Sequence, residues 1–233
     1  MPDYKAGAFI NYSLNLHSVG FSELPGVPNC CNQFNHGRGW DFSVGGIFEK
    51  RISDRSTISL SLAYERIDAE LSEIEIAWIS IDDELARAEI KHTIDANFAS
   101  ISLSSAYNHN IFNALWLSGG MSVAFLTNAS FRQQEELIRP VNRGTFENGR
   151  RIRNEREGAI GHSSNLLLFM DLGVQFELPL NRRGTTTISP RLTASLPLNS
   201  AISGEKWNIF RIQAGVYIKF STYDEIDTPL SPR

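Results

Sequence analysis

The chain has no long hydrophobic run. Although 42% of its 233 residues are hydrophobic, none of its apolar stretches approaches the roughly 18 residues that a transmembrane helix needs. It also carries little net charge, formally −4 at pH 7, which argues against nucleic acid as the main partner. No glycine-rich phosphate cradle, zinc signature or carboxylate pair stands out. We therefore expect no catalysis, no cofactor and no bound metal.

What the chain does have is a two-residue period. In eight stretches every second side chain is apolar, and the side chains between them are mostly polar or small. Successive side chains of a β-strand point to opposite faces of the sheet, so this period predicts strands with one apolar face. The predicted strands span about 8–16, 40–49, 58–65, 90–107, 113–126, 164–178, 187–196 and 210–220.

The two faces of these strands differ in polarity. In the third stretch, Leu60 and Leu62 alternate with Ser59 and Ser61. A closed antiparallel barrel in a lipid bilayer requires an apolar outer face, and its closure usually needs an even number of strands. We therefore predict an all-β fold, an eight-stranded antiparallel up-and-down transmembrane β-barrel. The alternative is a soluble lipocalin-like ligand binder, in which the same period places the apolar face inside.

Two positions interrupt the pattern. The phase of the fourth stretch slips near Phe98, and we expect a bulge there. Pro190 lies inside the seventh stretch and has no N–H to donate, so we expect a second bulge, because a closed barrel has no free edge. Leu167 and Phe169 also place apolar side chains on the otherwise polar face of the sixth stretch.

The links between the stretches alternate in length. The short links are 50–56, 108–112 and 179–184, and the long ones are 18–39, 68–89, 127–163 and 197–206. Outer-membrane barrels have short periplasmic turns and long extracellular loops, so we expect both termini in the periplasm. Residues 1–222 would form the barrel, and residues 223–233 a periplasmic tail or linker stub. The chain enters the first strand almost at once, so we expect a mature chain whose leader has been removed.

Aromatic residues gather near the predicted strand ends, as in the interfacial belts of membrane proteins. The alternative for these residues is ordinary packing in a protein core. The expected turn-side belt is Phe48, Tyr107, Phe112, Trp116, Phe176 and Phe220, and the expected loop-side belt is Trp40, Phe125, Trp207 and Phe210.

The polar face of the predicted barrel carries both acids and bases. If the strands pair across the short turns, Asp41 lies near Glu65, and Asp171 approaches Arg191. An eight-stranded barrel is just wide enough to be filled by side chains, and buried charges persist only when paired. We therefore expect a polar network that plugs the lumen, with a gate or narrow ion path as the alternative. The expected network is Asp41, Glu65, Asp95, Asp171, Arg191, Arg211 and Lys219.

Two segments resemble a known family. They are the first long link, Leu24-Pro25-Gly26-Val27-Pro28-Asn29-Cys30-Cys31-Asn32-Gln33-Phe34 with the following Gly37-Arg38-Gly39-Trp40 and Gly45-Gly46, and the last stretch, Ala214 to Phe220. They resemble small outer-membrane barrels of the OmpA-like and OmpX-like kind, most closely N-terminal barrel domains of OmpA-family proteins from Bacteroidetes and Chlorobi-type bacteria. In that family a peptidoglycan-binding domain often follows the barrel, and the tail from Asp224 looks like the start of such a linker.

The long links carry further candidate sites. Cys30 and Cys31 are the only cysteines, and in an oxidising compartment the options are a strained disulfide, a bridge to a partner or a lipid. The segment 74–81 is more apolar than an exposed loop, so it either extends a hairpin beyond the membrane or contacts another protein. Arginine forks suit lipopolysaccharide phosphates, although interleaved glutamates also fit a solvated loop. The arginines concerned are Arg139, Arg143, Arg150, Arg151 and Arg153.

One short motif bears on catalysis. His162-Ser163-Ser164-Asn165 faintly resembles the His-x-Ser-Asn stretch of lipid A deacylases, whose serine needs a base and an acid close by. Asp171 and Glu177 lie about 30 and 50 Å further along an extended strand, which leaves only an acid from another link, such as Glu205. We therefore expect a non-enzymatic outer-membrane barrel that serves as a structural, anchoring and interaction module. The expected partners are membrane lipids, lipopolysaccharide and other outer-membrane or periplasmic proteins, and the alternatives are a narrow channel or a lipid A-modifying enzyme.

Overall fold

The protein is built from β-strands. The computed structural model describes residues 4–27, 33–81, 84–141 and 143–222. Among these residues, no helix is long and apolar enough to cross a membrane. The strands are β1 (Tyr4–Phe21), β2 (Phe34–Ser53), β3 (Ser56–Arg66), β4 (Ala69–Ile81), β5 (Glu84–Phe112), β6 (Leu115–Arg139), β7 (Ile152–Ala159), β8 (Leu166–Phe176), β9 (Leu178–Pro179), β10 (Thr186–Pro197) and β11 (Trp207–Thr222).

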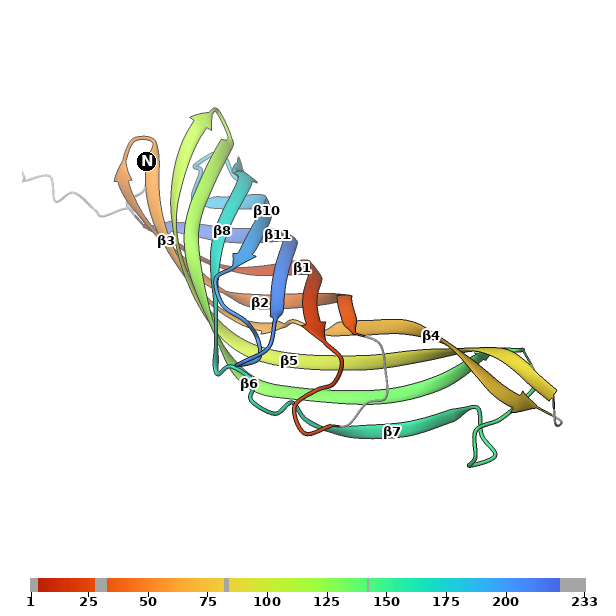
Figure 1. The fold of residues 1–233 in the computed structure, drawn as a ribbon. Helices are drawn as coiled ribbons and strands as arrows, with labels where there is room; N and C mark the ends of the chain where they lie inside the picture. The colour runs from red at the N-terminus through yellow and green to blue at the C-terminus, as the bar shows by residue number, and fades with distance from the viewer. Residues whose placement is uncertain (1–3, 28–32, 82–83, 142, 223–233) are drawn as a thin grey trace, which may run out of the picture.

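Eight of these strands close into a barrel (Figure 1). The ring runs β1, β2, β3, β5, β6, β8, β10, β11 and back to β1, and every neighbouring pair is antiparallel. Closure comes from the first and last strands, which pair continuously from Tyr4 with Thr222 to Val19 with Trp207. The predicted eight-stranded up-and-down barrel is therefore confirmed, and both described chain ends lie at the end of the short turns.

The outer wall of the barrel is apolar. Leu60 is 48% exposed and Ile218 is 42% exposed, whereas the neighbouring Lys219 is fully buried inside. The period predicted this alternation, and the closed ring decides which face is outside. The reversed arrangement of a soluble lipocalin-like barrel is therefore wrong. Other exposed apolar side chains on the wall are Ile10, Val44, Leu62, Leu103, Met121, Leu172 and Leu192.

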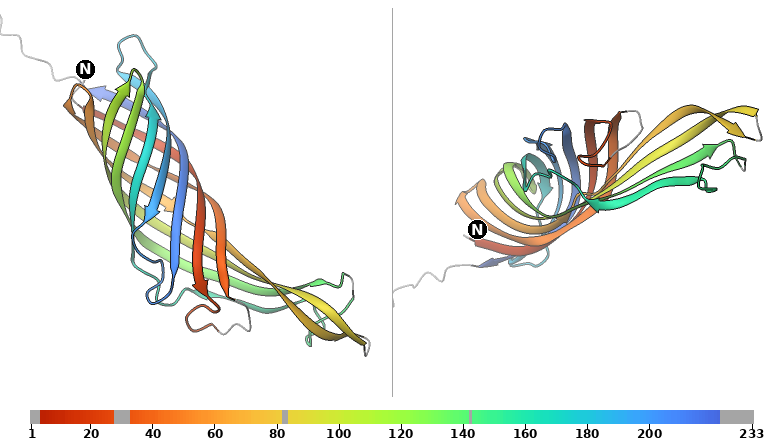
Figure 2. Two further views of the ribbon diagram at one scale, coloured as in Figure 1. Left: turned by 45° about the horizontal axis from the view of Figure 1, so that its top comes forward. Right: turned by 60° about the horizontal axis from the view of Figure 1, so that its bottom comes forward.

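Four strands continue beyond the ring and form a protruding sheet, here called the arm (Figure 2). The arm comprises β4, residues 84–98 of β5, residues 128–139 of β6, and β7. It leaves the barrel at the end away from the N-terminus. The links at 68–89 and 127–163, expected as loops, are therefore largely strand. Segment 74–81 extends a hairpin, because β4 pairs with β5 as far as Ile81 and Glu84.

The register does shift near Phe98, but the extra residue lies on the partner strand. Ala99 pairs with Asn128 and Ser100 pairs with Leu126, so Thr127 of β6 is the inserted residue. Strand β5 keeps its parity through this point. Its inward face changes from serine to apolar residues there, and that change looked like a phase slip in the sequence.

Pro190 causes no bulge, contrary to the expectation. It pairs with Val216 of β11 in unbroken register. On its other side the ladder of β10 is interrupted instead, because pairing with β8 stops at Arg191 with Gln175 and pairing with β9 resumes at Ile188 with Leu178. The N–H of Glu177 between them donates to the carbonyl of Ala114. The missing donor of Pro190 therefore falls opposite a gap in the ladder.

Two of the predicted belt residues lie inside the barrel. Trp116 is 7% exposed and Trp207 is fully buried, because both have the inward parity of their strands. Their assignment to the belts was wrong. Of the other belt residues, Phe210 is half-buried, and the exposed ones are Trp40, Phe48, Tyr107, Phe112, Phe125, Phe176 and Phe220.

A cluster of apolar side chains fills the barrel at the end where the arm leaves. It contains Trp207, Phe98 and Phe169, all almost fully buried, and the Phe98 and Trp207 rings meet edge to face at 5.5 Å. Leu167 belongs to the same cluster. The apolar residues that broke the polar face of the sixth stretch therefore belong to an apolar cluster at the mouth, here called the plug.

Candidate functional site

The polar lumen is arranged in layers, and the first lies at the end of the short turns. Lys219 of β11 places its Nζ 3.0 Å from the Oε2 of Glu49 and 3.0 Å from the Oε1 of Glu177. Lys5 of β1 contacts the same Glu177 oxygen at 2.5 Å. Two cations therefore neutralise two carboxylates. Above this layer toward the turns lies a cavity of about 330 Å³, whose wall includes Trp116.

An aromatic layer follows. The rings of Phe9 and Tyr217 stack at 4.6 Å, and the Arg191 guanidinium lies 5.5 Å from the centre of the Tyr217 ring. Phe9 lies opposite Gly45 on β2. A β-carbon at position 45 would come within 2.8 Å of the Phe9 ring and 2.2 Å of the carbonyl oxygen of Leu62. Glycine at this position is what lets the ring lie across β2.

An ion pair spans the middle of the lumen. The Nη1 of Arg211 on β11 lies 2.5 Å from the Oε2 of Glu65 on β3, and the two side chains are 2% and 9% exposed. The Arg211 guanidinium also stacks on the Phe169 ring at 4.2 Å, so it connects the polar layer to the apolar plug. The cavity beside the pair holds only about 40 Å³, room for roughly three waters at most.

Asp171 and Arg191 do not pair. The register places Asp171 opposite Ser195, while Arg191 lies opposite Gln175. Arg191 instead donates to the hydroxyls of Thr193 at 3.1 Å and Ser118 at 3.1 Å. Asp171 lines the same small cavity as Arg191. The expected contact failed because period alone does not fix the offset between two strands.

Asp41 is held by neutral donors. Its Oδ2 accepts hydrogen bonds from the Nδ2 of Asn15 at 2.7 Å and from the backbone N–H of Asp68 at 2.6 Å. Asp68 in turn accepts from the backbone N–H of Phe98 at 3.0 Å. These bonds join β1 and β2 to the break between β3 and β4, where the arm begins.

Asp95 lies apart from the other expected lumen residues, which is a correction to the sequence-based set. It is on the arm, where its neighbours in the ladder are Glu70 and Arg132. It lies there because β5 runs on past the ring. Burial raises the pKa of the Asp95 carboxyl above its ordinary value, and Glu70 raises it further, while Arg132 and Lys91 oppose the rise.

The sequence-based set missed three members of the turn-end layer. Glu49, Glu177 and Lys5 all have the inward parity of their segments, and each lies within a few residues of a strand end. A search for inward charges next to the short turns would have found Glu49 and Glu177. Their convergence on Lys219 needs the ring to close, so no local pattern predicts it.

The arginines of the third long link bind mostly within the arm. Arg139 contacts Glu89 at 3.3 Å, and Arg153 contacts Glu135 at 2.7 Å. Arg150 contacts Glu155 at 3.0 Å. Arg151 donates to four backbone carbonyls, among them those of Arg143 and Leu137. Cys30 and Cys31 lie outside the described residues.

The deacylase-like motif has no assembled triad in the described part of the chain. The Ser164 hydroxyl donates to the carbonyl of Ser200 at 2.8 Å. The Glu205 carbonyl, not its carboxylate, contacts this region by accepting from Ser200. No hydrogen bond of the described residues joins the His162 ring to a serine or an acid.

A closed antiparallel ring with an apolar outer wall and buried charges inside defines a transmembrane β-barrel, because hydrocarbon accepts no unpaired strand edge. Outer-membrane barrels are the class with this design. No family model and no curated protein matches the sequence.

Several solved structures are similar in fold. One is Ail, the attachment invasion locus protein of Yersinia pestis, at 12% identity and a TM-score of 0.41, with 94% of this chain and 100% of that chain covered. Another is Neisserial surface protein A, at 9% identity and a TM-score of 0.40, with 93% and 97% covered. A third is the outer membrane protease OmpT from Escherichia coli, at 7% identity and a TM-score of 0.40, with 94% and 97% covered. The assignment to the class rests on the ring and its two faces, not on these scores.

Proposed function

We propose that the chain is an outer-membrane barrel with a closed lumen that holds the arm outside the cell as a contact surface. Both termini then face the periplasm, as the short turns at their end of the barrel favour. The proposal rests on one observation: the barrel has an interior occupied by ion pairs and apolar side chains, and it also carries a protruding sheet. Catalysis is not part of the proposal.

The filled interior supports an anchoring role over transport. Ion pairs lie across the turn end and the middle of the lumen, and the apolar cluster around Trp207 lies across the mouth. An ion that entered the cluster would lose its hydration without gaining a partner, which is costly. A narrow channel is therefore the weaker candidate.

Planar-bilayer recording tests the closed lumen. The wild-type protein should insert without steady conductance. A variant with Trp207→Ala and Phe98→Ala, which removes two large side chains of the plug, is the matched comparison for an opened mouth. Steady, sizeable pores from the wild-type protein would show that it is a channel and would refute the anchoring proposal.

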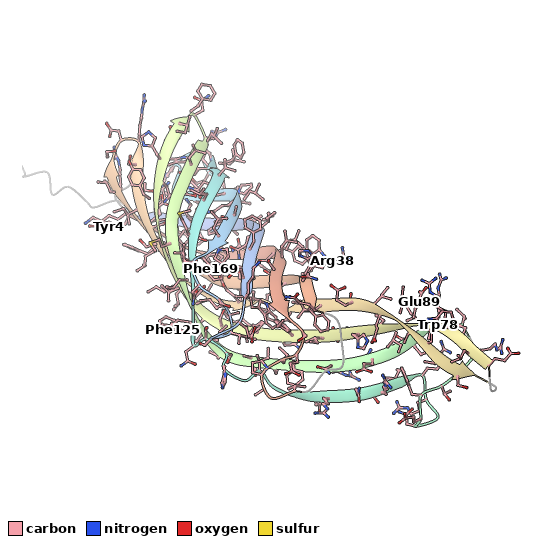
Figure 3. The ribbon with its side chains drawn as sticks, viewed as in Figure 1. Tyr4, Arg38, Trp78, Glu89, Phe125 and Phe169 are labelled. Carbon is pink, nitrogen blue, oxygen red and sulfur yellow. The ribbon has the colours of Figure 1, made fainter. Side chains whose placement is uncertain are left out.

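The free edge of β4 supports the contact role. Beyond Leu71, which pairs with Gly37, β4 has β5 as its only partner among the described strands. On its outer face Ile74, Ile76 and Trp78 are 53%, 57% and 69% exposed. An unpaired, apolar edge strand is a template on which another protein can add a strand. Figure 3 shows Trp78 near the tip of the arm, away from the barrel.

Photo-crosslinking in intact envelopes tests this surface. A crosslinker at Trp78 should yield a discrete adduct with another protein. A crosslinker at Arg55, in a short turn, should yield different adducts or none. Ile76→Pro, which cannot extend a strand ladder, should abolish the Trp78 adduct and leave insertion intact. An adduct that persists unchanged in the Ile76→Pro variant would count against strand addition.

Kinship with OmpA-type N-terminal barrels is the finer part of the proposal, and it rests on the first-link motif. Lipopolysaccharide contact through Arg139, Arg143, Arg150, Arg151 and Arg153 is another finer part. Most of these side chains already bind carboxylates or carbonyls of the arm, so fewer of their N–H donors remain for a phosphate.

A further inference from the structure

The outer wall carries a groove where the arm leaves the barrel. It has a volume of about 900 Å³ and lies between the loop-side ends of β1 and β2 and the start of β4. Its lining includes Leu16, Arg38, Trp40, Glu70 and Ser72. Arg38 and Trp40 share the outward face of β2, so the groove opens on the same side of the wall as the lipid-facing residues. Figure 3 places Arg38 on β2 beside the root of the arm.

Arg38 is an exposed cation whose guanidinium has no hydrogen bond or ion pair among the described residues. It lies opposite Leu16 on β1 and opposite Glu70 on β4. Glu70 is already bound by Lys91, whose Nζ lies 3.1 Å from its Oε1. No hydrogen bond or ion pair of the described residues involves the Arg38 guanidinium. Its five N–H donors are therefore available to a ligand.

The charge around the groove favours an anion. Arg38 and Lys91 carry two positive charges against the single negative charge of Glu70. The next pair along the ladder, Asp95 and Arg132, is neutral in sum. The wall beside the groove therefore has a net charge of about +1 at neutral pH.

On the side away from the arm, the groove is continuous with the membrane-facing surface of the barrel. The rings of Tyr12 and Trp40 stack at 5.4 Å on the outer wall, and both side chains are more than half exposed. Exposed tyrosine and tryptophan mark the level of lipid headgroups in membrane proteins. Arg38 lies two residues beyond Trp40, and on the proposed membrane location this position corresponds to the depth of a headgroup phosphate.

We propose that this groove binds the phosphorylated headgroup of a lipid in the leaflet at the loop side, with the phosphate on Arg38 and the acyl chains along Leu16, Trp40 and Tyr12. Arginine suits this role because its planar fork binds phosphate oxygens in pairs. The site rests on the proposed membrane location. It is separate from the lipopolysaccharide contact proposed for the arginines of the arm.

Native mass spectrometry of the delipidated, detergent-solubilised protein tests the site. The probes are phosphatidylglycerol, lipid A, a diacylglycerol with the same acyl chains, and inorganic phosphate. One phosphatidylglycerol or lipid A molecule should bind more tightly than diacylglycerol. Whichever of these two lipids binds more tightly identifies the headgroup. Arg38→Gln should weaken that binding about fivefold, the effect expected for one cation near a lipid phosphate, whereas Arg38→Lys should retain most of it.

Arg87→Gln is the matched control, because Arg87 is an exposed arginine on the arm, away from the groove. It should leave lipid binding unchanged. Equal binding of diacylglycerol, an equal loss in Arg87→Gln, or saturation by inorganic phosphate in place of lipid would each overturn the site. Flotation with lipid vesicles is measured separately, and failure of the wild-type protein to float would refute the membrane location itself.

Discussion

Replacement of Arg211 by methionine should destabilise the barrel strongly. The change keeps an unbranched stem of similar length but removes the cation that lies 2.5 Å from Glu65. The Glu65 carboxylate is then left in the lumen beside a cavity of about 40 Å³, which is too small to hydrate it fully. Breaking one side of a buried ion pair costs about 3 to 5 kcal/mol.

The contact of Arg211 with the Phe169 ring adds to this loss. A desolvated cation over an aromatic ring contributes about 0.5 to 2 kcal/mol, but part of that overlaps with the pair. A total near 4 kcal/mol is therefore expected, which corresponds to roughly a thousandfold change in the folding equilibrium. Reversible urea unfolding in lipid vesicles, followed by tryptophan fluorescence, measures it.

Two further variants make this prediction refutable. Arg211→Met combined with Glu65→Leu removes both charges and should recover most of the stability, since an apolar replacement of a buried pair is often neutral or better. Asp54→Asn, at an exposed pair with Arg51 in a short turn, should change little. If Arg211→Met costs no more than Asp54→Asn, the lumen is filled with water and the closed-interior argument is wrong.

Three other predictions follow from particular side chains. Gly45→Val should prevent folding to the compact form seen on unheated gels, because the β-carbon of the valine would lie 2.2 Å from the carbonyl oxygen of Leu62. Gly46→Val is the control and should fold normally, because a β-carbon at position 46 has no neighbour nearer than 3.7 Å. Trp207→Ala should cost about 3 to 5 kcal/mol in the same urea assay, with the exposed Trp40→Ala as control. The raised pKa of Asp95 means that the folded arm binds its proton more tightly than the unfolded chain does. The contribution of Asp95 to the stability of the folded arm is therefore fully present at low pH. It is lost as the pH rises from the ordinary pKa of aspartate through the raised pKa of Asp95. Asp95→Asn should remove that dependence and slow amide exchange in the arm at pH 7, after correction for intrinsic rates, and unchanged exchange would contradict it.

The buried face of the barrel was predictable to the residue in most strands. Alternation placed Leu60 and Ile218 outside and Glu65, Arg211 and Lys219 inside, because a strand has only two faces and local sequence decides which residues share one. The same argument does not extend to contacts across the lumen. Lys219 contacts Glu49 and Glu177, which are far from it and from each other in the sequence. Asp171 pairs with Ser195, four residues away from Arg191, so the predicted contact between Asp171 and Arg191 does not form.

By itself the sequence determined the eight strands of the ring, their order as set by short and long links, and the side chains on each face, since all of these follow from a period of two and from turn length. Only the tertiary structure decided which strands run past the ring to make the arm, where Asp95 lies, and that Phe98, Phe169 and Trp207 meet as a plug. Those features depend on the pairing of distant strands. Pairing depends on register and closure, and both belong to the whole ring.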